Sequence, residues 1–87
     1  MIYISFLSMV KKRLTRKGNI CGSNVRAIRK KVGMAQADLA AALNVDFWYQ
    51  FVQSDISEIE QNYRGVKDHE LKALAAVLET TADVLLT

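Results

Sequence analysis

The chain lacks proline altogether, and it has a single cysteine, Cys21, and a single histidine, His69, among its 87 residues. Without proline, nothing in the sequence strongly interrupts helices. One thiol excludes an internal disulfide and fits a reducing compartment such as the cytoplasm, and one thiol with one imidazole excludes an ordinary Cys/His zinc site. No apolar run reaches the roughly 20 residues that a membrane-spanning helix needs. The sequence therefore predicts a cytoplasmic protein without a metal, a cofactor or a membrane span.

Acidic residues are missing from a whole region, the first 37 positions. That region contains nine basic residues and carries +9, whereas the last 50 residues contain three basic and nine acidic residues and carry −6. The asymmetry indicates an anionic partner for the N-terminal half, either nucleic acid or a membrane surface. The alternative is a solvated basic tail. The nine basic residues are Lys11, Lys12, Arg13, Arg16, Lys17, Arg26, Arg29, Lys30 and Lys31.

The composition suits one small folded domain. With 51% hydrophobic and 24% charged residues, the chain is too apolar to be disordered. A chain this short buries a modest share of its surface, which favours a compact helical fold or an oligomer. Residues 1–19 form an apolar and then basic arm in this interpretation, and residues 20–87 form the domain.

Helical periodicity begins at Cys21, and Gly33 suits the position just beyond the end of a first helix. A second helix is expected to open near Gln36. Residues 44–53 contain four of the seven aromatic residues and either extend this second helix or form a bulky turn. Residues at three- or four-residue steps are expected to face the core from these two helices: Cys21, Val25, Ile28, Val32, Leu39, Ala40 and Leu43.

Three more helices are expected in the second half of the chain. One covers about 54–62 with Ile56 and Ile59 inward, and Asp55 followed by Glu58 forms a capping box there only if Asp55 is itself the cap. Asp68 is the expected N-cap of the next helix, with Leu71, Leu74, Ala75 and Leu78 inward, and Thr81 caps a short last helix. The expected fold is all-α, a compact bundle of about five short helices that follows the arm.

Residues 20–87 resemble the Cro/C1-type (XRE-like) helix-turn-helix DNA-binding domains of bacteria and phages. No single stretch is specific, but their order and spacing together make the match. The stretches are VRAIR at 25–29, GMAQ at 33–36, LA at 39–40, Leu43, ISEIE at 56–60, KDHEL at 67–71, LA at 74–75 and TADVLL at 81–86. The resemblance implies a lambda-repressor-like fold in which the helix at about 53–62 enters the major groove of DNA.

The function that the resemblance implies is that of a sequence-specific transcriptional regulator, by expectation a repressor, which binds double-stranded DNA as a homodimer. Gln53, Ser54 and Glu58 match base-reading positions, and Gln36 matches a residue that touches a phosphate at the start of the second helix. Arg29 and Glu60 match a buried ion pair. The full set of DNA-binding residues expected on this basis is Gln36, Gln53, Ser54, Asp55, Ser57, Glu58, Asn62, Arg64 and Lys67.

Two features depart from the family pattern. Val45 and Ile56 are eleven positions apart, further than is common in the family, so extra residues enter the turn. The presumed recognition helix is acidic and contains no Lys or Arg, so we expect affinity to come from the 11–17 arm and from exposed basic residues of the first helix. The aromatic residues at 47–51 either fill the core or form a dimer contact, a ligand pocket or a wedge against DNA.

A protein-interaction or antitoxin-like module on the same scaffold is the main alternative, since the acidic helix and the aromatic turn favour it. An enzyme is not expected, because the sequence contains no Gly-rich phosphate loop, no Cys–His pair with a third orienting group and no paired metal ligands. Peripheral membrane contact through residues 1–17 is a weaker alternative, and no membrane partner is expected.

Overall fold

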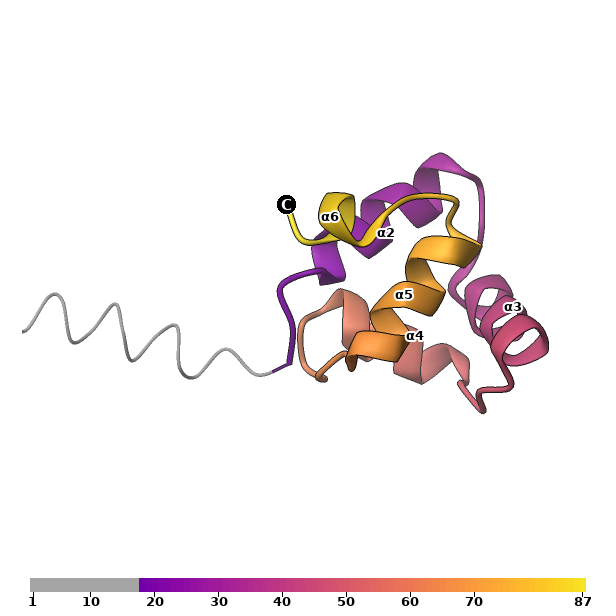
Figure 1. Ribbon diagram of the computed structural model, residues 1–87. Helices are drawn as coiled ribbons and strands as arrows, with labels where there is room; N and C mark the ends of the chain where they lie inside the picture. Colours follow the sequence, from indigo (N-terminus) through magenta and orange to yellow (C-terminus); the bar gives the residue numbers. More distant parts are fainter. Residues whose placement is uncertain (1–17) are drawn as a thin grey trace, which may run out of the picture.

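The computed structural model describes residues 18–87, and the expectations for residues 1–17 lie outside the described residues. Within 18–87 every regular element is a helix, so the all-α class is confirmed. The helices are α2 (Gly22–Lys31), α3 (Gln36–Phe47), α4 (Gln53–Glu60), α5 (Asp68–Val77) and α6 (Ala82–Leu85), arranged as Figure 1 shows.

Helices α3, α4 and α5 begin in the same way, with a carboxylate in the first turn that bonds to the N-cap. The residue three positions after the N-cap accepts a hydrogen bond from the N-cap backbone N–H at 2.9 Å in α3, α4 and α5, through Asp38, Asp55 and Glu70. A negative charge at this position also complements the positive end of the helix dipole. The expected N-cap Asp68 is therefore wrong, because Asp68 is the first residue of α5. The condition for a capping box between Asp55 and Glu58 is not met, because Asp55 is the third residue of α4 and not its cap.

Other end signals are confirmed. Gly33 adopts φ +79° just beyond α2, in the left-handed region that glycine reaches without strain. The Thr81 hydroxyl accepts a hydrogen bond from the Val84 N–H at 3.2 Å and so caps α6.

The core consists of residues from all five helices, together with Phe51 from the turn before α4. Ile56 and Ile59 anchor α4 against α2 and α3, and α5 packs on α3 and α6. Val32 was expected to face the core, but this expectation is wrong: Val32 lies beyond the last turn of α2 and is 51% exposed. The buried hydrophobic residues are Cys21, Val25, Leu39, Ala40, Leu43, Phe51, Ile56, Ile59, Ala73, Leu74, Ala75, Leu78 and Leu85.

Residues 44–53, which were expected either to extend the second helix or to form a bulky turn, do both. Phe47 extends α3, and Trp48 then ends it in the left-handed conformation, at φ +65°. The Asn44 side chain holds the turn by donating to the Phe51 carbonyl at 2.8 Å and accepting from the Phe51 N–H at 2.7 Å. Phe51 thereby enters the core with Tyr49 packed against it, whereas Trp48 stays 91% exposed.

Candidate nucleic-acid interface

Helix α4 divides its residues between an apolar and a polar face. Ile56 and Ile59 are fully buried, while Gln53, Ser54 and Glu58 are exposed. Asp55 and Ser57 are half-buried beside them. The helix therefore presents its polar side outward from the folded domain, which is the arrangement that reading a groove requires.

The ion pair implied for Arg29 and Glu60 is present and joins α2 to the end of α4. The guanidinium donates through Nε to Glu60 Oε2 at 2.6 Å and through Nη2 to Glu60 Oε1 at 3.1 Å. Its Nη1 donates to the Met34 carbonyl at 2.6 Å. The two side chains are only 8% and 1% exposed. The hydrogen bond to Glu60 raises the pKa of Arg29, so this charge is fixed under ordinary conditions.

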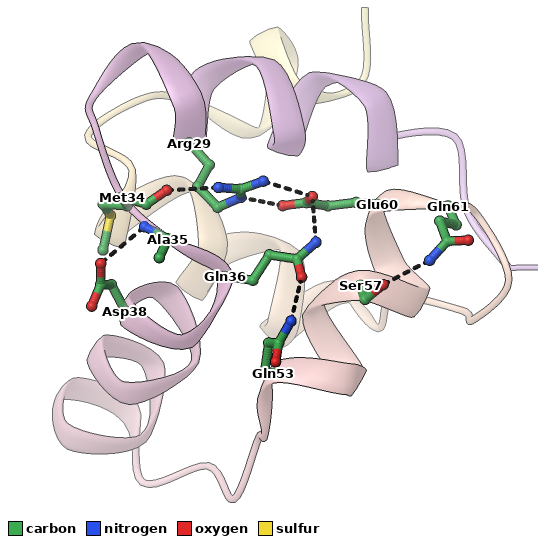
Figure 2. A network of polar contacts seen from close by, with 9 residues as sticks. All are labelled: Arg29, Met34, Ala35, Gln36, Asp38, Gln53, Ser57, Glu60 and Gln61. Carbon is green, nitrogen blue, oxygen red and sulfur yellow. Dashed lines mark hydrogen bonds and ion pairs between the residues drawn. The ribbon is translucent and has the colours of Figure 1, made fainter.

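Two glutamines extend this pair to the exposed start of α4. Gln36 Nε2 donates to Glu60 Oε1 at 3.0 Å, and Gln53 Nε2 donates to Gln36 Oε1 at 3.0 Å. Figure 2 shows the resulting chain from Arg29 through Glu60 and Gln36 to Gln53. Because an amide group has two donors and two lone pairs, Gln53 keeps its carbonyl oxygen and one N–H for a ligand. The buried charge pair thus orients an exposed amide.

Toward its C-terminal end, α4 contributes less to the exposed face than expected. Gln61 Nε2 donates to Ser57 Oγ at 2.6 Å, which ties these two side chains together. Asn62 adopts φ +65° and turns its amide oxygen into the protein, where it is buried without a partner among residues 18–87. A Cβ at Gly22 would lie 2.5 Å from that oxygen, so Asn62 faces the start of α2 and not the outer face of α4.

Arg64 and Lys67, the two expected DNA-binding residues that lie after the Asn62 turn, have different surroundings. The Arg64 guanidinium lies 3.1 Å from Glu70, 3.9 Å from Asp55 and 5.0 Å from the centre of the Phe51 ring. Its charge is therefore engaged within the domain. Lys67 is exposed, and its ammonium forms no ion pair in the described part of the chain.

Asn19 is a positioning residue whose role the sequence patterns did not predict. Its Nδ2 donates to the carbonyls of Ile59 at 3.1 Å and Arg64 at 2.7 Å, and its Oδ1 accepts from the Gly22 N–H at 2.6 Å. These bonds hold the chain before α2 against the end of α4. An asparagine three residues before the helix was the available signal, but its long-range partners are 40 and 45 positions away.

Within residues 18–87, no helix is long and apolar enough to cross a membrane, and no group of three or more His, Cys, Asp or Glu side chains could hold a metal ion. Comparisons with protein-family models, with curated proteins and with solved structures found no match.

Proposed function

We propose that this protein is a sequence-specific DNA-binding regulator of transcription that inserts α4 into the major groove. The observation that carries the proposal is the Gln53 amide, exposed at the start of α4 and oriented through Gln36 by the buried Arg29–Glu60 pair. An orientation set before binding lowers the entropy lost when the side chain meets a base. The resemblance to Cro/C1-type domains favours the same function.

In this proposal the exposed residues of α4 read base edges directly. B-DNA's major groove is about 12 Å wide and admits one helix. Gln53 retains a donor and an acceptor, the pair of groups that a bidentate contact with adenine uses. The Glu58 carboxylate accepts a hydrogen bond from the amino group of cytosine, and its negative charge disfavours placing it against a phosphate.

The start of α3 supplies the anchoring contact in the same proposal. Backbone N–H groups at a helix N-terminus attract a phosphate, and Gln36 retains one amide N–H for it. A homodimer would place two α4 helices roughly 34–36 Å apart, on adjacent turns of one DNA face. Binding of such a dimer over a promoter would repress transcription.

Selection of bound fragments from a random DNA pool with the full chain tests the proposal. We expect a palindromic sequence to be enriched, and we expect its affinity to fall steeply as salt rises. Gln53→Ala should weaken binding and relax one position in each half-site, whereas Gln50→Ala, an exposed glutamine in the turn, is the matched control and should do neither. A pool that shows no enriched sequence would refute sequence-specific regulation.

A protein-interaction or antitoxin-like module is the second candidate. It is favoured by the aromatic turn, where Trp48 is 91% exposed and where Val45 and Val52, a few positions away in the sequence, are exposed as well. Such an apolar surface is typical of a site that contacts another protein. This candidate predicts that a partner protein co-purifies with the wild-type chain but not with the Trp48→Ala variant. It also predicts that neither the wild type nor the variant binds DNA.

A further inference from the structure

A second glutamine lies on the exposed side of α4, and the proposed function uses only the first. Gln53, Ser57 and Gln61 recur at four-residue steps, so their side chains follow one another along one side of the helix. Gln53 and Gln61 are exposed, and Ser57 between them is half-buried. Ile56 and Ile59 are buried on the side that faces the core. The exposed side of α4 thus has a glutamine at each end.

Gln61 keeps a helical position although α4 ends just before it. Its backbone N–H donates to the Ser57 carbonyl at 3.0 Å, which is the bond that a residue inside a helix makes. Asn62, the next residue, leaves the helix at φ +65° and turns its amide oxygen into the protein. Gln61 therefore takes the outward position that the family resemblance assigned to Asn62.

A hydrogen bond within the domain orients the Gln61 amide, as another one orients the Gln53 amide. Gln61 Nε2 donates to Ser57 Oγ at 2.6 Å, and Gln53 Nε2 donates to Gln36 Oε1 at 3.0 Å; Figure 2 shows both bonds. Each bond uses one amide N–H and leaves the other N–H and the carbonyl oxygen for a ligand. Both amides thus present a donor and an acceptor whose orientation is set before binding.

We propose that Gln61 is a second base-reading residue, so that each DNA half-site contains two adenines, one bound by Gln53 and one by Gln61. This inference rests on the proposed function and names the class of DNA sequence that α4 takes. The free donor and acceptor of each amide match the N7 acceptor and the N6 amino group of adenine in the major groove. Ser57 is a positioning residue, because it acts through the amide of Gln61.

The distance between the two adenines follows from the geometry of the helix. Gln53 and Gln61 are eight positions apart, which is about 12 Å along a helix axis. Successive bases of one strand are about 3.4 Å apart along the DNA axis, so this length covers three or four positions when α4 is parallel with that axis and fewer when it is inclined. We therefore expect the two adenines to be about two to four base pairs apart.

Selection from a random DNA pool compares the full wild-type chain with Gln53→Ala and Gln61→Ala. We expect Gln61→Ala to lose the preference for adenine at one position of each half-site, about two to four base pairs from the position that Gln53→Ala relaxes. Its affinity for the wild-type sequence should fall about 5- to 150-fold, the range for one bidentate base contact. Gln50→Ala, an exposed glutamine outside α4, is the control and should select the wild-type sequence.

Two results of this comparison would overturn the inference. One is a Gln61→Ala variant that selects the same sequence as the wild type. The other is a Gln61→Ala variant that binds all sequences more weakly by the same factor, because a contact with phosphate or sugar carries no direct sequence information.

A change in the DNA tests which base atom Gln61 contacts. Replacing the adenine at the relaxed position with 7-deazaadenine removes the N7 acceptor. We expect this replacement to weaken binding by the wild type about 2- to 10-fold, the value of one hydrogen bond, and to leave binding by Gln61→Ala unchanged. Equal losses for the two proteins would overturn the contact between Gln61 and that adenine.

Ser57→Ala tests the orientation of the amide. Loss of the hydroxyl should weaken the preference for adenine only at the position that Gln61 reads, and Ser57→Thr, which keeps a hydroxyl, should restore it. Adding Ser57→Ala to Gln61→Ala should cause no further loss of affinity, because the two side chains act as a unit. A full additional loss in this double variant would overturn the positioning role of Ser57.

The outcomes separate this inference from the proposed function. Wild-type protein that selects no DNA sequence overturns both. Wild-type protein that selects a sequence which Gln53→Ala relaxes and Gln61→Ala does not overturns the second contact alone and leaves the assignment of α4 in place.

Discussion

Removing Glu60 while leaving Arg29 should remove a large share of the stability of this domain. The pair is almost completely shielded from water, and Glu60 accepts from both Arg29 and Gln36. In Glu60→Ala, the Nε and Nη2 groups of Arg29 lose their partners, and Nη1 keeps only the Met34 carbonyl. Stranding one member of a buried pair costs about 3–5 kcal/mol, against the total of about 5–15 kcal/mol that is typical of small domains.

Urea unfolding followed by circular dichroism measures this loss. Glu58→Ala is the matched control, because Glu58 is an exposed glutamate on the same helix and should change the unfolding free energy by less than about 0.5 kcal/mol. Replacing both partners, as Arg29→Met with Glu60→Leu, should recover much of the stability because no buried charge remains. Equal losses for Glu60→Ala and Glu58→Ala would refute the account of the buried pair.

The double variant also separates stability from readout. It should fold, yet it leaves Gln36 without the Glu60 acceptor that orients it and, through it, Gln53. We therefore expect weaker selectivity for the base that Gln53 reads, measured by competition between the selected DNA sequence and single-base variants. Unchanged selectivity in a folded double variant would show that the network does not orient Gln53.

Three further predictions concern single positions. Arg64→Gln should lower stability but leave unchanged the slope of log K for DNA binding against log salt concentration, because the Arg64 guanidinium is paired with carboxylates of the domain. Lys67→Gln should make that slope shallower by about 0.9, because the Lys67 ammonium is exposed. The opposite pattern would reverse the two roles. Gly22→Ala should prevent stable folding, seen as loss of the cooperative urea transition, because the new Cβ would lie 2.2 Å from the Ile59 carbonyl oxygen; a native-like transition would contradict that contact. Burial raises the pKa of the Cys21 thiol above its ordinary 9.0, so the unfolding free energy should fall as the pH rises above about 9, and Cys21→Ala should lose this part of the pH dependence.

The sign of that last effect follows from linkage. Above pH 9 the unfolded chain releases the thiol proton while the folded protein still holds it, so the unfolded state is favoured as the pH rises. Below pH 9 both states hold the proton, and the stabilising contribution is fully present. Parallel curves for wild type and Cys21→Ala between pH 8 and 10 would refute the assignment.

Local patterns were sufficient to predict which segments are helical. The three- and four-residue steps of apolar side chains located α2 to α6, and Gly33 and Thr81 located two of their ends, because these signals act within one or two turns. The true N-caps lie three positions before Asp55 and one position before Asp68, and sequence could not tell these places apart, since an acidic residue suits both the cap and the first turn. For α4, the start of the helix depends on the preceding turn, which two hydrogen bonds between Asn44 and Phe51 hold in place.

Contacts between distant parts of the chain could not be obtained from periodicity. Arg29 and Glu60 lie 31 positions apart, and only the family resemblance paired them before the structure placed their side chains 2.6 Å apart. The family resemblance implied that Arg64 binds DNA, yet the fold brings Asp55, Glu70 and the Phe51 ring around its guanidinium.

Composition and local pattern thus decided the helical class, the charge asymmetry and the outward polar face of α4, because each depends on residue type and on neighbours within a turn or two. Packing decided which charges are free and where the chain joins the domain. Asn19 illustrates the reason: its two carbonyl partners belong to residues 40 and 45 positions away, and only the assembled core brings them within hydrogen-bond distance.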